Sequence, residues 1–217
     1  MKLHADLTKP AWVDSNALDW VPSPFPGVDR RMLDRDGDEV AHATSIVRYA
    51  PGSVFPTHVH GGGEEFLVLD GVFSDESGDY PAGTYVRNPV GSSHAPRTAD
   101  GCTIFVKLRQ MDPADQTQVT IDTNDGDWVD GAPAGLFRQH LHEYGDEKVW
   151  LTKMGPGCVA DPHYHPGGEE VLVLDGEMED ESGVYGKGAW FRLPPGSRHS
   201  PRTKPGCLLW VKQGHLK

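Results

Sequence analysis

Cysteine is scarce in this sequence, with only three in 217 residues. Cys102, Cys158 and Cys207 are odd in number, and none of them belongs to a CxxC pair. A disulfide framework uses cysteines in pairs, and a cysteine-based zinc site needs closely spaced thiolates. Both are therefore excluded, and we expect reduced thiols.

Long hydrophobic runs and an excess of basic residues are also missing. No apolar stretch of about 18 residues occurs, and Met1 to Val13 alternates polar and apolar residues, unlike a signal peptide. The net charge is −12, from 32 acidic and 20 basic residues. Sequence-independent binding to nucleic acid or anionic lipid needs an excess of Lys and Arg. We therefore expect a cytoplasmic protein that binds neither nucleic acid nor membranes directly.

Glycine and proline, by contrast, are abundant. The 26 Gly and 18 Pro make up 44 of the 217 residues, well above the share of about 12% in ordinary chains. Gly and Pro both destabilise helix interiors, so this composition favours an all-β fold. A short helix is expected only near Ser15 to Trp20.

An internal repeat organises the chain. More than half of the positions from Pro51 to Lys107 are identical to their partners 105 residues later, from Pro156 to Lys212. A period of this length matches a small complete domain rather than a solenoid unit. We therefore predict two domains, residues 1–110 and 111–217, with a connector from Gln110 to Asp127.

Within each copy, short apolar runs alternate with turn residues. Phe66 to Leu69 and Val171 to Leu174 are predicted strands followed by Asp-Gly, and Thr84 to Arg87 is predicted to be a strand that enters a Pro-Val-Gly turn. The pattern is typical of a small antiparallel β-domain.

Histidine and glutamate recur at the same positions in both copies. His58 and His60 are two residues apart in a predicted strand, so both side chains point to one face. Glu64 keeps that parity, and a strand and a turn can bring His94 back across a barrel. We define the first His/Glu group as His58, His60, Glu64 and His94, and the second as His163, His165, Glu169 and His199.

Three imidazoles and a carboxylate are costly to bury together unless a cation lies between them. The alternatives are exposed polar residues on two loops, or a buried hydrogen-bonded histidine cluster. Because both groups are complete and identically spaced, we favour one divalent metal ion per copy.

These motifs resemble the two sequence motifs of the cupin superfamily. The segments GSVFPTHVHGGGEEFLVLDG and GTYVRNPVGSSH, from Gly52 and Gly83, carry the resemblance in the first copy, and GCVADPHYHPGGEEVLVLDG and GAWFRLPPGSRH carry it in the second. The resemblance implies two tandem jelly-roll barrels, a bicupin. It also implies that the two His/Glu groups are the metal ligands.

Within the cupins, the strings GGEE, VLDG, DESG and PRT resemble the ChrR-type cupin domain. The best-known member of that group is a zinc-containing anti-sigma factor, so the resemblance implies zinc, with Fe(II), Mn(II) and Ni(II) as alternatives, and a sigma factor as a partner. Its helical sigma-binding domain has no counterpart in residues 1–50, which contain no Cys and only His4 and His42.

Several other polar residues are interpreted as structural. His140 and His142 form a third HxH without a downstream Glu and His at cupin spacing, so we interpret them as a solvated strand face. Cys102 and Cys207 alternate with apolar residues and are expected in the core. Arg87 and its partner Arg192 could line a cavity mouth or pair with Asp75 and Asp180, and pairing at the surface is the default expectation.

Two functions remain open from the sequence. The first is a regulatory or sensor-like metal protein, with a small ligand or an oxidant as its signal. The second is a cupin dioxygenase that acts on a small organic substrate at an open metal position. No further acid or base stands out in both copies, so no catalytic residue is assigned. The chain is expected to be a monomer or a homodimer.

Overall fold

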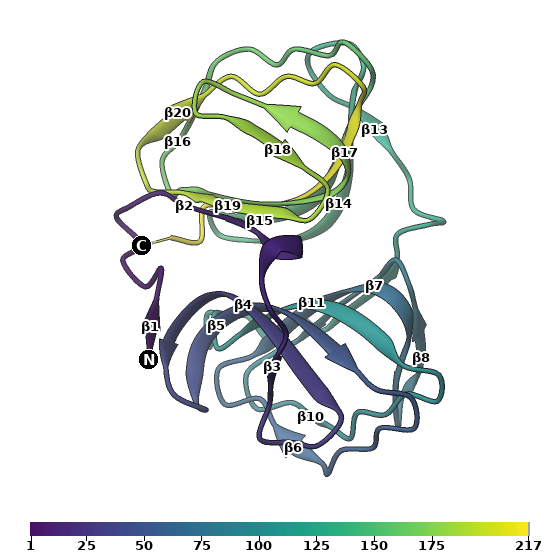
Figure 1. Cartoon of the computed structure of the whole chain (residues 1–217). Helices are drawn as coiled ribbons and strands as arrows, with labels where there is room; N and C mark the ends of the chain where they lie inside the picture. The colour runs from purple at the N-terminus through teal and green to yellow at the C-terminus, as the bar shows by residue number, and fades with distance from the viewer. Residues whose placement is uncertain (217) are drawn as a thin grey trace. The chain divides into compact units, whose positions relative to one another are not determined.

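The computed structural model describes residues 1–216, and these form two compact units (Figure 1). The first barrel comprises Met1–Ala5 and Leu18–Asp125, and the second barrel comprises Asp6–Ala17 and Gly126–Lys217. Strands dominate both units. The predicted all-β fold with two tandem cupin barrels is confirmed.

The first barrel is built on one large antiparallel sheet in the order β1-β4-β5-β11-β7-β9-β12, with β3 beside β4 and β8 beside β7. A small sheet of β6 and β10 completes it. The strands are β1 (Lys2–Leu3), β3 (Val21–Pro22), β4 (Val28–Gly37), β5 (Ala41–Tyr49), β6 (His58–Val59), β7 (Glu64–Asp75), β8 (Gly78–Pro81), β9 (Thr84–Asn88), β10 (Ser93–His94), β11 (Cys102–Leu108) and β12 (Val119–Asp122).

The second barrel repeats this arrangement. Its large sheet has the order β13-β14-β15-β21-β17-β19-β2, with β18 beside β17, and its small sheet pairs β16 with β20. The strands are β2 (Ala11–Asp14), β13 (Val129–Asp130), β14 (Leu136–Tyr144), β15 (Glu147–Met154), β16 (His163–His165), β17 (Glu169–Glu179), β18 (Val184–Gly186), β19 (Ala189–Leu193), β20 (Ser197–His199) and β21 (Cys207–Gln213).

The helix predicted near Ser15 to Trp20 is reduced to one 3-10 turn, Ser15–Ala17. The Ser15 amide donates to the Gly188 carbonyl, and the Asn16 side chain donates to the Lys187 carbonyl. These bonds bind the segment to the turn before β19. The segment therefore serves as a turn at the end of β2 and does not extend into a helix.

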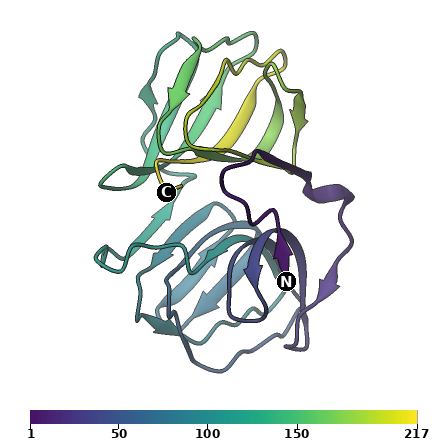
Figure 2. The same cartoon turned by 90° about the vertical axis from the view of Figure 1, so that its left-hand side faces the viewer.

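Each barrel contains one strand from the other side of the predicted boundary between residues 110 and 111. β2 pairs with β19 in the second barrel, where the purple N-terminal segment lies beside its strands (Figure 2). β12 pairs with β9 in the first barrel. The compact units therefore differ from the contiguous segments 1–110 and 111–217.

The two hydrophobic cores are built from matching positions of the two copies. The first contains Phe66, Phe73 and Ile104, and the second contains Val171, Met178 and Leu209 at the same places. The expectation that Cys102 and Cys207 lie in the core is confirmed, because both belong to these clusters with less than a tenth of their surface exposed. Cys158 is buried as well, and all three thiols are free.

Gly71 and its partner Gly176 permit a close approach of two strands. Their φ angles are 71° and 72°, in the left-handed region that glycine adopts without steric cost. A Cβ atom at either position would collide with a backbone carbonyl, that of Gly101 or Gly206. Both glycines lie in the strand that carries the metal-ligand glutamate candidate, so they fix how that strand packs against β11 or β21.

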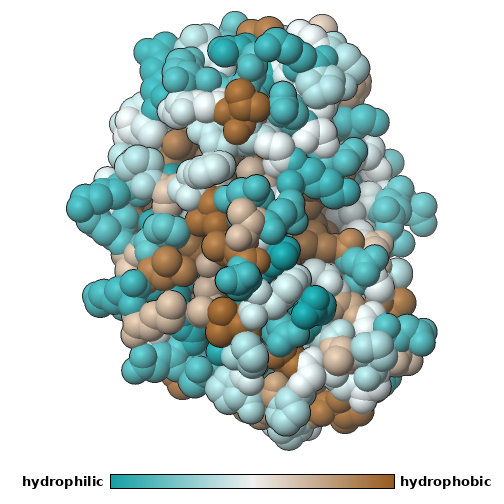
Figure 3. Space-filling view, viewed as in Figure 1, coloured by the Kyte–Doolittle hydropathy of each residue, from teal (hydrophilic) through white to brown (hydrophobic). Residues whose placement is uncertain are grey.

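No helix among the described residues is long and apolar enough to span a membrane. Exposed hydrophobic side chains occur among hydrophilic ones on the face shown in Figure 3. Scattered exposure of this kind is ordinary for a folded protein.

We predict that the three thiols are unreactive in the folded protein. Burial raises the pKa of both Cys102 and Cys207 to about 11 and raises that of Cys158, and only the thiolate reacts. Ellman's reagent at about pH 8 should label none of them before unfolding and all three in denaturant. Rapid labelling of the native chain would contradict the burial.

Candidate metal centres

Two short strands position the histidines of the first His/Glu group. β6 and β10 pair so that His58 lies opposite His94, and the alternation of the strand directs His60 to the same side as His58. Glu64 begins β7, where its side chain points to the interior of the barrel. The second group is positioned in the same way, with His163 opposite His199 in β16 and β20 and Glu169 at the start of β17.

The four side chains of the first group meet around one point. The ring centroids of the three histidines are 4.6 to 5.1 Å apart. The Nε2 atoms of His60 and His94 lie 3.4 and 3.3 Å from Glu64 Oε2. His60, Glu64 and His94 are buried, whereas His58 is exposed.

The second group has the same arrangement with small differences. Its ring centroids are 4.8 to 5.0 Å apart, and His165 and His199 Nε2 lie 3.5 and 3.1 Å from Glu169 Oε2. Gln213 donates to the other oxygen of Glu169 at 2.7 Å. In the first group Asn88 donates instead to Glu64 Oε2, at 3.3 Å.

The facing atoms of both groups lack hydrogen-bond partners among the described residues. These atoms are Nε2 of His60, His94, His165 and His199, together with Glu169 Oε2, and all are buried. Buried polar atoms without partners are costly, and a cation between them removes that cost. In each group the four ligand atoms lie within 4.8 Å of one another. The donor set of three imidazoles and one carboxylate suits a divalent ion of the first transition series or zinc.

Burial and the neighbouring carboxylates set the charge of the second group. Burial lowers the pKa of His165 to about 4, so its ring is neutral at neutral pH. At His199 burial also acts to lower the pKa, but the hydrogen bond with Asp180 and the proximity of Glu169 raise it to about 9. Burial would raise the pKa of Glu169, yet its contacts with His199 and His165 hold it below its ordinary value. A carboxylate facing imidazoles is therefore kept ionised for a cation.

Two aspartates outside the predicted ligand set orient the last histidine of each group. Asp75 Oδ2 lies 3.1 Å from His94 Nδ1, and Asp180 Oδ2 lies 3.1 Å from His199 Nδ1. The other oxygen of Asp75 accepts from the Tyr80 hydroxyl and the Ser77 amide. A carboxylate that holds Nδ1–H leaves Nε2 as the metal-binding nitrogen. The signal in the sequence was the recurrence of Asp75 and Asp180 at the 105-residue spacing.

The second glutamate of each pair, Glu65 or Glu170, bonds to residues outside the His/Glu groups. Glu65 accepts from Arg87 at 2.8 Å and from the Tyr85 hydroxyl at 2.9 Å, while Arg87 also reaches Asp115 at 2.7 Å. Arg87 is 1% exposed and Arg192 is 2% exposed. The expectation that these arginines pair at the surface is therefore wrong. Residues distant in sequence cover both arginines. Arg87, for example, is covered by Asp115, which belongs to the predicted connector.

The third HxH is not a solvated strand face throughout. His140 is exposed, as predicted, but His142 is buried. A β-bulge between these two residues shifts the register of β14 against β15, and a bulge breaks the alternation of side chains. No member of this motif joins either His/Glu group.

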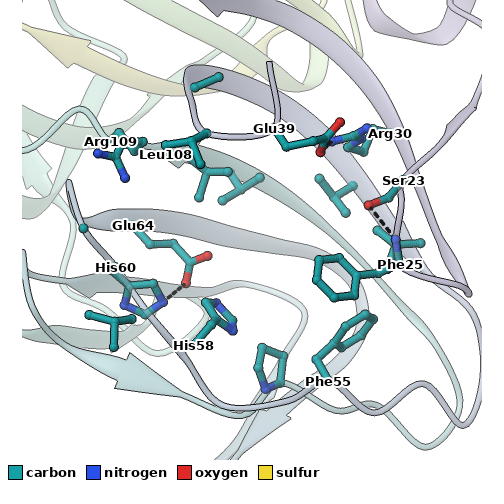
Figure 4. A pocket seen from close by; sticks show the side chains of 18 of the residues that line it. Ser23, Phe25, Arg30, Glu39, Phe55, His58, His60, Glu64, Leu108 and Arg109 are labelled. Atoms are coloured by element: carbon teal, nitrogen blue, oxygen red, sulfur yellow. Dashed lines mark hydrogen bonds and ion pairs between the residues drawn. The ribbon is translucent and has the colours of Figure 1, made fainter. Parts of the chain in front are cut away.

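A cavity of about 430 Å³ opens beside the first His/Glu group (Figure 4). His58, His60 and Glu64 form one part of its wall. Phe25 and Phe55 pack edge to face in another part of the wall, with ring centroids 6.1 Å apart. The volume is within the usual range of small-molecule sites, about 300 to 1,000 Å³. A metal ion bound by this group would therefore be accessible to a small molecule.

A metal held by these residues would supply a Lewis acid and open coordination positions. The protein residues contribute imidazoles and a carboxylate held in fixed positions, and the first barrel adds a partly apolar cavity.

We predict that Asp75→Asn weakens metal binding by the first group about 10- to 100-fold, the usual cost of losing such a supporting carboxylate. The measurement is a chelator competition with the metal ion alone, in a chain whose second group is disabled by His163→Ala. Asp79→Asn, an exposed change on the neighbouring β8, is the matched control. Equal affinities for Asp75→Asn and the parent would show that His94 needs no such support.

Comparison with known proteins agrees with the fold and the repeat. The sequence model of the protein family described as "ChrR Cupin-like domain" matches residues 8–112 and again residues 116–217. No curated protein matches the chain.

Solved structures resemble the whole chain at low identity. A proposed dioxygenase from Nostoc punctiforme is 17% identical, with 96% of this chain and 84% of that chain covered and a TM-score of 0.80. A cupin 2 conserved barrel domain protein from Leptotrichia buccalis is 14% identical (98% and 99% covered, TM-score 0.64), and an oxalate decarboxylase from Lactobacillus farciminis is 13% identical (95% and 86% covered, TM-score 0.65). These likenesses show the shared fold. Since the family model matches nearly the whole chain in two successive copies, the protein belongs to the ChrR cupin-like family as a bicupin.

Proposed function

We propose that each barrel binds one divalent metal ion through its three histidines and one glutamate. The observation that carries this proposal is the set of buried, unpartnered Nε2 atoms that face a carboxylate in both groups. The same arrangement recurs in two copies that differ at many other positions. A hydrogen-bonded histidine cluster would pair these atoms with one another.

We further propose zinc as the metal and a regulatory or sensor-like role, in keeping with the ChrR family. A zinc ion held by four protein ligands is redox-inert and needs no catalytic acid or base. The signal would be a small ligand or an oxidant. A sigma factor stays a proposed partner. The proposal also retains a cytoplasmic location, a monomer or homodimer, and no direct binding to nucleic acid or membranes.

A second candidate function is favoured by the cavity beside the first His/Glu group. An exposed His58 and an adjoining space of about 430 Å³ would give a substrate access to the metal. An Fe(II)-dependent dioxygenase of small organic molecules would use such access, and Mn(II) or Ni(II) are alternatives. A similar structure comes from a proposed dioxygenase.

We predict about two metal ions per chain in protein purified without added metal, because both groups are complete. His58→Ala combined with His163→Ala should abolish this binding, since each change removes one ligand. Elemental analysis measures the content, and Asp79→Asn serves as a folded control. Fewer than about half an equivalent of metal in the parent would refute metal binding by both barrels.

The identity of the metal separates the two functions. Zinc without oxygen consumption would support the regulatory role, and a pull-down with sigma factors would then test that partner. Iron with substrate-triggered oxygen consumption, measured with an oxygen electrode, would support the dioxygenase and overturn the regulatory proposal.

A further inference from the structure

The two copies diverge where the first barrel lines its cavity. The ligand candidates and the strands around them are conserved between the copies, but Phe55 is replaced by Ala160 and Arg109 by Gly214. Phe25 corresponds to Pro133 of the second copy. The alignment follows from the strands, because Val28 and Leu136 pair with residues 49 and 154, which are equivalent in the repeat. The cavity of the first barrel therefore has a lining of its own, distinct from the shared metal-ligand pattern.

Arg109 adopts a backbone conformation that an arginine rarely takes. Its φ is 60°, while the glycine at the same place in the second barrel, Gly214, has φ 76°. A non-glycine residue in this region is strained, and such strain is concentrated at functional sites. The first barrel thus keeps an arginine where the fold favours glycine.

The guanidinium of Arg109 lies beside the first His/Glu group. It packs against the backbone of Gly61, so that a Cβ built there would be 3.0 Å from Arg109 Nη1, and Gly61 directly follows His60. Within residues 1–216, no hydrogen bond or ion pair of this guanidinium is found. Arg30, the other arginine of the cavity, is paired with Glu39 at 3.1 Å. Arg109 is therefore the cation of the cavity that is available to a ligand.

The rest of the wall is mainly apolar. Tyr49 packs edge-on against Phe55 at 5.3 Å between centroids, and Phe25 also packs edge-on against Phe55. Val47 and Val106 line the cavity as well. In Figure 4, the two phenylalanines face the space on one side, while His58, His60 and Glu64 face it from another, and Arg109 lies near Leu108. Flat apolar groups stack well on such rings.

We propose that the first barrel binds a small organic carboxylate with an aromatic body, the carboxylate pairing with Arg109 and the body packing against Phe25 and Phe55. This inference builds on the proposed function, because the ligand would lie beside the metal of the first His/Glu group. An arginine fork suits a carboxylate in a bidentate pair. The second barrel, with glycine and alanine at these positions, binds no such anion.

The test is calorimetric titration of the full chain with phenylacetate and, as a neutral isostere, phenylacetamide. We expect phenylacetate to bind at one site per chain and at least about tenfold more tightly than phenylacetamide, since a charge-assisted pair is lost with the amide. Arg109→Gln should weaken phenylacetate about tenfold and leave phenylacetamide unchanged. Phe55→Ala, which copies the second barrel, should weaken both ligands.

The matched control is Arg48→Gln in the same barrel. Arg48 lies between the cavity residues Val47 and Tyr49 but pairs with Asp29 on the opposite face of the sheet, so its loss should change neither affinity. Equal binding of the acid and the amide, an effect of Arg48→Gln as large as that of Arg109→Gln, or no binding by either probe would overturn the inference.

Metal content is measured on the same samples, before and after chelator treatment. Binding of phenylacetate that depends on Arg109 supports the inference with or without metal. If the chain holds no metal but shows this binding, only the proposed metal function fails. If the chain holds two metal ions but phenylacetate binding is absent, only the carboxylate inference fails.

Discussion

The cost of burying unpartnered polar atoms is the constraint on which the rest of this structure depends. In each barrel, two buried imidazole nitrogens are turned toward a carboxylate oxygen and have no hydrogen-bond partner among the described residues. A fold tolerates this only if the surrounding structure holds the side chains in place and a cation balances their desolvation. Asp75 and Asp180 supply part of that support by fixing Nδ1 of His94 and His199. The same aspartates accept from turn amides and from a tyrosine hydroxyl, so the turn and the metal group are held by one carboxylate.

The two barrels share this inner arrangement and differ around it. The glutamate is held by Asn88 in the first barrel and by Gln213 in the second, at places occupied by Leu193 and Leu108 in the other copy. The residue that donates to the carboxylate therefore lies in β9 in the first barrel and in β21 in the second. The carboxylate keeps its position relative to the histidines. The cavity lining has diverged further, because it does not hold the ligands in place. A duplicated chain can thus keep two similar His/Glu groups while the cavity lining beside one of them changes.

Much of the fold and of the candidate site could be predicted from the sequence, because the repeat marks the same residues twice. In each copy, the convergence of three histidines and one glutamate follows from strand parity and motif spacing. The burial of His142 could not be predicted, since a β-bulge reverses the parity that the HxH pattern implies. The burial of Arg87 depends on Asp115, which reaches it from the connector. The contact of Asp75 with His94 could not be predicted, because the local turn pattern accounts for one carboxylate oxygen of Asp75, whereas the other meets a histidine 19 residues away.

The exchange of β2 and β12 means that the repeated unit of the sequence is not the unit that folds. Residues 13–21, VDSNALDWV, correspond to residues 121–129, IDTNDGDWV, yet the strand that leads into each segment completes the barrel of the other copy. A chain with a single copy would have an unpaired sheet edge at β9 and one strand without a partner. Two such chains could each pair that strand with the open edge of the other chain. In the fused chain this exchange is intramolecular, because one polypeptide supplies both β2 and β12. If the chain were cut between residues 110 and 111, each barrel would still need one strand from the other fragment.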